Sequence, residues 1–221
     1  MKNINAFRQR RGRVLSTQIQ VLSDQMGRKI NVLDVGGRAA YWQNIDTSHI
    51  AKIVLMNLDE DELEPDDAVG TVEFVFEVGD ARILDGYDDK SLDFVHSNSV
   101  IEHVGPWQDM AAMASEMQRV AIGGWMQTPA WIFPVEPHFR APFLHWFGQP
   151  VRRRMLSMSK YYRHLGVAER RYHVDRINLL SRKEVEALFP NSEIYVEWFG
   201  LPKSYVAWWN HHNPAVERGA S

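Results

Sequence analysis

The sequence predicts an α/β fold: a doubly wound, mostly parallel sheet of seven strands with an antiparallel last strand and helices on both faces. Three observations predict it. Between residues 30 and 129, short apolar runs alternate with helical patterns, as buried parallel strands and their crossover helices do. Two strand-like segments, 193–199 and 204–209, are joined by a short connection that permits only antiparallel pairing. The 221 residues, 45% of them hydrophobic, are enough for one domain with a sizeable core.

The individual elements follow from the spacing of apolar residues. Five strands are expected before the C-terminal pair, at 30–35, 53–58, 72–78, 92–97 and 125–127. Apolar residues recur every three or four positions over 14–26 and over 110–121, which predicts two helices, the second ended by the glycine pair 123–124. Ser181 and Glu184 form a capping box, which predicts a third helix after them.

Residues 130–178 have a different composition. Prolines interrupt this stretch, and no helical or strand period is sustained. Its aromatic residues include Trp131, Phe133, Phe139, Phe143, Trp146 and Phe147. A segment this apolar does not remain a solvated linker, so we expect an insertion between strands five and six that lies over a site.

Composition and charge exclude several classes of function. The net charge of -3 gives no general attraction to nucleic acid or to an anionic membrane. The chain has no cysteine, which excludes disulfides, thiolate metal sites and a cysteine nucleophile. The N-terminus lacks the apolar core of a signal peptide, and no apolar run is long enough to span a membrane. These features favour a soluble, cytoplasmic protein.

The end of the first strand is the first candidate ligand site. Doubly wound sheets bind ligands beyond the carboxyl ends of their strands. Here Asp34 precedes a turn containing Gly36 and Gly37, and glycine lets the backbone turn sharply and approach a ligand closely. The alternative is a tight strand-to-helix turn with no ligand.

The end of the second strand carries Asn57, Leu58 and Asp59. Asn57 lies 23 residues after Asp34, about the interval at which nucleotide-binding sheets present a carboxylate to ribose hydroxyls. The alternative is that Asp59 opens an acidic, solvated loop.

The third and fourth strands also end in polar residues. The third is followed by Gly79, Asp80 and Ala81, where the carboxylate either accepts a hydrogen bond from an exocyclic amine or caps a turn. The fourth ends near Ser97 and Asn98, which we expect to meet the reactive end of a ligand.

Together, residues 30–129 resemble the class I S-adenosylmethionine-dependent methyltransferase family, in particular its type 11-like small-molecule subgroup. In that family the first strand ends in an acidic-x-Gly-x-Gly-x-Gly turn. Asp34 and Gly36 match this pattern, whereas Arg38 and Ala40 occupy the later glycine positions. The resemblance implies a Rossmann-like fold, methyl transfer as the activity and S-adenosyl-L-methionine as the cofactor.

The resemblance also implies which residues bind the cofactor. Asn57 takes the place of the family's ribose-binding acid and pairs hydroxyls more weakly. The cofactor-binding residues implied are Asp34, Gly36, Gly37, Arg38, Asn57, Leu58, Asp59, Gly79, Asp80, Ala81, Ser97 and Asn98.

We expect a single methyltransferase domain over residues 1–221. Its parts are an N-terminal helix (1–29), a cofactor-binding core (30–129), a substrate-covering insertion (130–178), the last helix and terminal strand pair (179–210) and a tail (211–221).

Methyl transfer from a sulfonium is an in-line displacement, so catalysis depends on positioning the nucleophile and removing its proton. The candidate catalytic residues are His138, His103 and Glu136. His103 has an alternative role in packing the loop beneath the cofactor, and His138 in a structural hydrogen bond. The spacing of Glu136, His138 and His145 matches no strong ligand pattern, so no metal is expected.

The acceptor is expected to bind under the insertion, at Trp131, His138, Arg140 and His145. Aromatic faces and arginines suit an organic, anionic acceptor such as a glycan, nucleotide-sugar or lipid-linked intermediate. The resemblance favours oxygen over nitrogen as the methylated atom. The basic segment 152–154 either clamps an anionic group or forms a solvated helix face.

Two other classes of function stay open at this stage. The replacements at Arg38, Ala40 and Asn57 are compatible with a non-catalytic or regulatory protein that binds the cofactor weakly. The arginine-rich insertion is compatible with nucleic-acid methylation, although the net charge and the lack of a separate recognition domain oppose a nucleic-acid partner.

Overall fold

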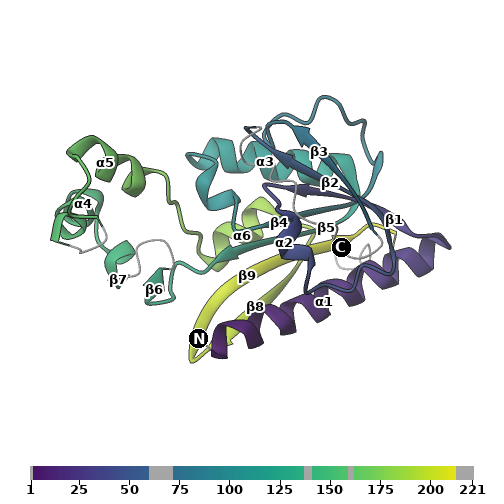
Figure 1. The fold of residues 1–221 in the computed structure, drawn as a ribbon, viewed down its shortest axis with the longest axis horizontal. Helices are drawn as coiled ribbons and strands as arrows, with labels where there is room; N and C mark the ends of the chain where they lie inside the picture. Colours follow the sequence, from purple (N-terminus) through teal and green to yellow (C-terminus); the bar gives the residue numbers. More distant parts are fainter. Residues whose placement is uncertain (1, 60–71, 137–140, 159–161, 213–221) are drawn as a thin grey trace.

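The computed structural model describes residues 2–59, 72–136, 141–158 and 162–212 (Figure 1). Within them, seven strands form one sheet in the order β3-β2-β1-β4-β5-β9-β8. The first five strands are parallel, and β9 is antiparallel to both β5 and β8. The strands are β1 (Ile30–Val35), β2 (Ile50–Asn57), β3 (Glu73–Val78), β4 (Leu92–Asn98), β5 (Ala121–Pro129), β8 (Glu193–Phe199) and β9 (Leu201–Asn210). The predicted fold class is confirmed.

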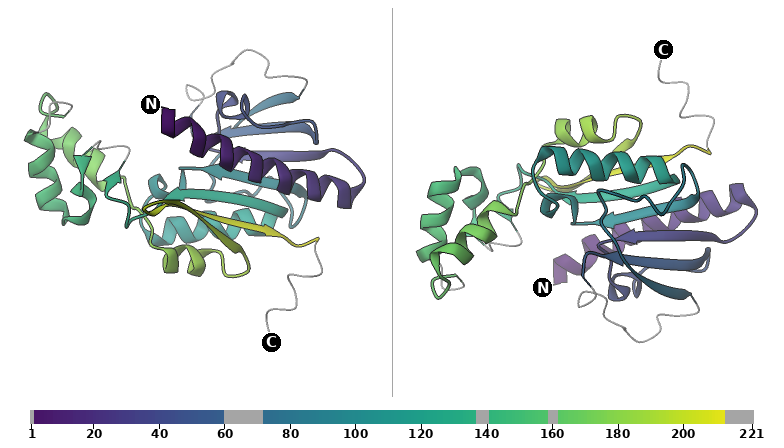
Figure 2. Two further views of the ribbon diagram at one scale, coloured as in Figure 1. Left: turned by 90° about the horizontal axis from the view of Figure 1, so that it is seen from below. Right: turned by 90° about the horizontal axis from the view of Figure 1, so that it is seen from above.

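Helices cover both faces of this sheet. Helix α1 (Lys2–Met26) and the short α2 (Ala39–Trp42) pack on one face, and α3 (Trp107–Val120) and α6 (Arg182–Leu188) pack on the other (Figure 2). In β1 the side chain of Val32 joins the α1 layer and that of Leu33 the α3 layer, because successive strand side chains point to opposite faces. This is why the strands read as continuous apolar runs.

Two boundaries differ from the prediction. Helix α1 begins at Lys2 instead of residue 14, so the basic N-terminal residues are its first turns. Helix α3 ends at Val120, and the pair Gly123 and Gly124 lies inside β5. A Cβ at Gly124 would stand 2.2 Å from Cζ2 of Trp209, so glycine at this position makes room for the indole.

The insertion forms a small lobe with its own core. Its elements are β6 (Val135–Glu136), β7 (Ala141–Pro142), a 3-10 turn (Leu144–Trp146), α4 (Gln149–Met158) and α5 (Val167–Asp175). The buried residues Leu144, Leu156, Val174 and Ile177 pack together inside it. Figures 1 and 2 show that α4 and α5 project beyond one end of the sheet. The insertion therefore extends away from the sheet, and its base lies next to the end of β5.

Candidate functional site

The turn after β1 requires its glycines. Gly36 has a φ of 69°, in the left-handed region, and its amide donates to the carbonyl of Met56 at 2.7 Å. A Cβ at Gly36 would stand 2.5 Å from Cγ2 of Val100, and one at Gly37 would stand 1.9 Å from Oδ2 of Asp34. Sterics alone therefore exclude a side chain at either glycine, whether or not a ligand is bound.

A buried polar cluster supports this turn from below. The carboxylate of Asp34 accepts from Nε1 of Trp42 at 2.7 Å and from Nδ1 of His96 at 2.6 Å. All three side chains are buried, and the rings of Tyr41 and Trp42 pack against the imidazole. Because Asp34 lies on β1, Trp42 on α2 and His96 on β4, the carboxylate joins three elements below the turn.

The end of β2 is tied to the same turn. Nδ2 of Asn57 donates to the carbonyl of Gly37 at 3.0 Å, and the carbonyl of Asn57 accepts from the amide of Gly79 at 2.9 Å. The next residue, Leu58, exposes its side chain to solvent, as does Asp59. Asn57 thus connects the turns that follow β1 and β3 and leaves an apolar side chain exposed beside them.

The end of β3 carries an ion pair. Asp80 binds the guanidinium of Arg82, with oxygen–nitrogen distances down to 2.6 Å, and the same guanidinium reaches Asp109 at 3.0 Å. Hydrogen bonds from Arg82 lower the pKa of Asp80. The carboxylate that the sequence assigns to an exocyclic amine is therefore shared with a cation of its own loop. Ala81 is buried and Ile83 is exposed.

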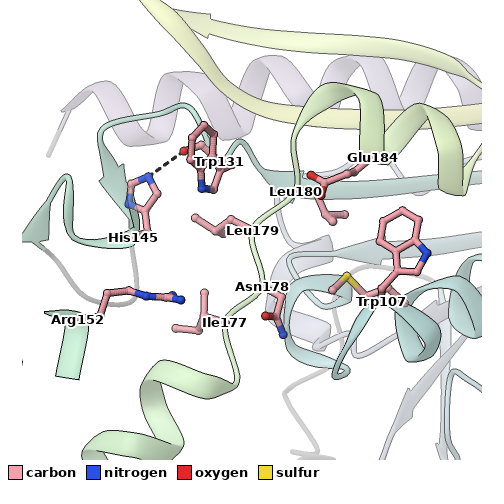
Figure 3. Close-up of a pocket in the computed structure, with 10 residues that line it drawn as sticks. Trp107, Trp131, His145, Arg152, Ile177, Asn178, Leu179, Leu180 and Glu184 are labelled. Atoms are coloured by element: carbon pink, nitrogen blue, oxygen red, sulfur yellow. Dashed lines mark hydrogen bonds between the residues drawn. The ribbon is translucent and has the colours of Figure 1, made fainter. Parts of the chain in front are cut away.

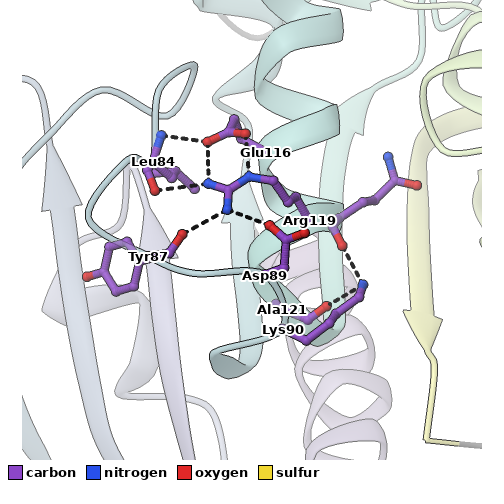
Figure 4. Close-up of polar contacts among 8 residues, drawn as sticks. Leu84, Tyr87, Asp89, Lys90, Glu116, Arg119 and Ala121 are labelled. Carbon is purple, nitrogen blue, oxygen red and sulfur yellow. Dashed lines mark hydrogen bonds and ion pairs between the residues drawn. The ribbon is translucent and has the colours of Figure 1, made fainter.

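The loop that follows is anchored to α3 through Arg119 (Figure 4). Its guanidinium binds Glu116 at 2.7 Å and donates to the carbonyls of Leu84 and Tyr87 at 3.1 and 2.8 Å. Glu116 in turn accepts from the amide of Leu84 at 2.8 Å. The hydrogen bonds from Arg119 raise the pKa of its partner's opposite sense: they lower the pKa of Glu116 and keep its carboxylate ionised. Together these contacts hold the loop in one position.

The end of β4 presents polar atoms with unused bonding capacity. Oγ of Ser97, Oδ1 of Asn98 and Nε2 of His96 are buried, and none has a hydrogen-bond partner within the described residues. Ser99 follows with a φ of 58°, and its Oγ donates to Oε1 of Gln127 at 3.0 Å. Buried polar atoms are normally paired, so these atoms indicate a place for a polar ligand.

The loop after β4 links the sheet to the insertion. Glu102 is buried and accepts from Oγ1 of Thr128, near the end of β5, at 2.9 Å. Its carbonyl accepts from the amide of Asn178, where the insertion returns to the sheet. His103, a predicted catalytic residue, lies half-buried in the same 3-10 turn (Ile101–His103).

A pocket lies at the base of the insertion (Figure 3). Its volume is about 300 Å³. It is lined by Trp107, Met110, Trp131, His145, Arg152, Ile177, Asn178, Leu179, Leu180 and Glu184. Trp131 and His145 were predicted to bind the acceptor, and they contact each other through Nε2 of His145 and the carbonyl of Trp131 at 2.9 Å. His138 and Arg140 lie outside the described residues; Glu136 belongs to β6, but only its backbone is described.

Three pocket residues were not singled out from the sequence. Trp107 begins α3, Asn178 follows α5, and Arg152 lies on α4. Burial lowers the pKa of Arg152, with Asp175 opposing the effect, and the buried Nε has no hydrogen-bond partner in the described part of the chain. The basic run 152–154 was the one sequence signal for this group, which brings an uncompensated positive charge to the pocket.

The fold and the strand-end turns define the class of protein. A sheet of this order, with a glycine turn after β1 and antiparallel strands at the far edge, is the Rossmann-like fold of class I methyltransferases. Residues 33–126 match the model of a family described as a methyltransferase domain. The chain therefore belongs to the S-adenosylmethionine-dependent methyltransferases of class I, with a type 11-like domain.

Solved structures agree with the fold. The magnesium protoporphyrin IX methyltransferase from Synechocystis, crystallised with bound S-adenosylhomocysteine, aligns with a TM-score of 0.57 at 13% identity, over 94% of this chain and 84% of that one. A SAM-dependent methyltransferase from Methanosarcina mazei aligns with a TM-score of 0.51 at 12% identity, over 82% and 92% of the two chains. No curated protein matches the sequence. At these identities the likeness shows the fold alone.

Proposed function

We propose that this enzyme transfers a methyl group from S-adenosylmethionine to an oxygen atom of an organic acceptor that carries an anionic group and binds in the pocket of Figure 3. One observation carries the proposal. Arg152 brings a guanidinium with a buried, unpaired Nε into a pocket walled by Trp107 and Trp131, and a carboxylate or phosphate would neutralise it.

The strand ends fit the methyl donor. The left-handed turn at Gly36 lets the backbone pass close to a ligand, and the exposed Leu58 and Ile83 offer apolar surface to an adenine ring. The unpaired Oδ1 of Asn98, at the end of β4, would accept a hydrogen bond from the ligand's polar end. When bound, S-adenosylmethionine supplies an already activated methyl group.

The chain's own contribution is then to bind and orient the acceptor. Trp107 and Trp131 provide flat apolar walls that exclude water, while Arg152 fixes the orientation of an anionic group. A pocket of about 300 Å³ is at the lower end of the range for small-molecule sites, which favours a single ring or sugar unit inside it.

An oxygen nucleophile requires a group that accepts its proton. We retain the three candidates predicted from the sequence: His103, His138 and Glu136. His103 is supported by its place four residues before Trp107, on the loop between β4 and the pocket. Glu102 holds that loop in place through Thr128.

Titration calorimetry with two variants tests donor and acceptor binding separately. Leu58→Asp is expected to weaken S-adenosylhomocysteine binding about tenfold, because a carboxylate replaces an apolar contact. Arg152→Gln should leave that affinity unchanged and remove the preference for glucose 1-phosphate over methyl glucoside, two probes that differ in the phosphate.

Each variant is the control for the other. No heat from the wild-type protein with millimolar S-adenosylmethionine would favour the non-catalytic alternative. Equal affinity of the wild-type pocket for glucose 1-phosphate and methyl glucoside would contradict the anionic acceptor and leave the donor assignment standing.

A further inference from the structure

Helix α4 presents apolar side chains to solvent. Phe147, Val151, Met155 and Met158 are 46%, 45%, 38% and 79% exposed. They are spaced by four, four and three residues, so they share one side of the helix. We call these four residues the α4 stripe. Of the residues within α4, only Leu156 is buried among the apolar ones, so most of the helix's apolar surface faces away from the lobe's core.

Aromatic side chains extend the α4 stripe toward β7. Phe143 and Trp146 are also exposed, and their rings lie 5.0 Å apart. Nε1 of Trp146 donates to the carbonyl of Trp131, which fixes its ring. Contiguous exposed apolar surface of this kind marks an interaction site.

The lobe is strongly basic although the whole chain is weakly acidic. Residues 141–158 and 162–180 contain seven arginines and two carboxylates, against a net charge of -3 for the chain. One of the two carboxylates, Asp175, is already bound by Arg153 and Arg171. Arg154 is exposed on α4, within a turn of the stripe. The lobe therefore carries excess positive charge next to its exposed apolar side chains.

The lobe is also placed where it can meet a large surface. Figures 1 and 2 show α4 and α5 at the far end of the molecule, away from α1 and the sheet. A flat partner can contact α4 without meeting the rest of the chain. No helix of the described residues is long and apolar enough to cross a membrane, so any contact with a bilayer would be at its surface.

We propose that the α4 stripe and the arginines around it dock the enzyme on the surface of an anionic phospholipid bilayer. Apolar side chains on one side of a helix enter the boundary between headgroups and acyl chains, and arginines bind the phosphates. A nucleic acid would use the aromatic rings and arginines but would gain little from Val151, Met155 and Met158. A second copy of the chain would bring the same positive charge to the interface.

Flotation with vesicles tests the proposal. The full chain should float with vesicles that contain phosphatidylglycerol and stay in solution with phosphatidylcholine alone. The double variant Met155→Asp/Met158→Asp should lose about tenfold in affinity for the anionic vesicles. Val21→Asp, on an exposed position of α1, is the matched control and should bind as the wild type does.

The proposal is overturned if the wild type does not float with anionic vesicles, or if the double variant floats as well as the wild type. It is also overturned if the stripe instead mediates a dimer in sedimentation experiments, or binds single-stranded RNA in preference to vesicles. A circular dichroism spectrum and S-adenosylhomocysteine binding unchanged in the double variant show that a loss comes from the surface. Flotation requires no methyl transfer, so its result is independent of the proposed function.

Discussion

Both carboxylate oxygens of Asp34 are used inside the protein, one by Trp42 and one by His96. The first carboxylate of the family's motif therefore supports the glycine turn from below. The same two donors would be left without an acceptor if the charge were removed, and a buried polar group without a partner costs more than the hydrogen bond itself contributes.

Asp34→Asn is expected to lower the free energy of unfolding by about 2 kcal/mol, because the amide of asparagine accepts less strongly and places a donor against a donor. Urea denaturation followed by fluorescence measures this. Asp59→Asn, at an exposed position, is the control and should change stability little. Equal stability of Asp34→Asn and the control would show that the buried cluster does not support the turn.

The sequence shows the glycine turn but not the cluster beneath it. Asp34 and Gly36 fit a known motif, whereas Trp42 and His96 belong to no motif and meet Asp34 only after β4 has paired with β1. The pocket is similar. Trp131 and His145 follow from the aromatic insertion, but Trp107 and Asn178 reach it from α3 and from the returning chain.

At the level of elements, apolar content decided what the sequence could predict. The strands were found because each is buried on both sides and reads as an apolar run. The first half of α1 was missed because its residues up to Arg13 are mostly polar and show no apolar period. Helix α4 was missed because most of its apolar side chains face solvent and only Leu156 faces the core, so no inward-facing period exists.

The loop between β3 and β4 gives a prediction at this scale. Replacing Arg119 by glutamine removes the donors that join Leu84, Tyr87 and Asp89 to α3. Amide hydrogen exchange in the loop should become about tenfold faster, because local opening then breaks fewer bonds. Arg171→Gln, in the distant lobe, is the control. Unchanged exchange at Leu84 and Tyr87 would contradict an anchoring role for Arg119.

For the whole molecule, several carboxylates predict how stability depends on pH. Burial raises the pKa of Asp93, but hydrogen bonds from Arg28 and from the amide of Asn31 outweigh burial and lower it. The pKa values of Asp46, Asp80, Glu116 and Asp175 are also lowered. A carboxylate with a lowered pKa stabilises the fold above its unfolded pKa of about 4, and that stabilisation is lost as the pH falls through the folded pKa.

Unfolding in urea should therefore show falling stability below about pH 5. Asp93→Asn is expected to be less stable than the wild type by about 2 kcal/mol at pH 7, and the difference should narrow toward pH 3 as Asp93 becomes protonated. Asp59→Asn again serves as the control. A difference that stays constant from pH 7 to pH 3 would contradict a charged Asp93 as the source of the stabilisation.

The two chain segments that enter and leave the insertion lie side by side. Ala130 pairs with Leu180 in a parallel bridge, and the amide of Trp131 donates to the carbonyl of Leu180. Everything between them packs around a separate core of Leu144, Leu156, Val174 and Ile177. A segment with adjacent ends and its own core can be exchanged for another of different length without altering the strand ends that bind the donor. Acceptor choice can thus change during evolution while the methyl-donating half of the enzyme stays constant.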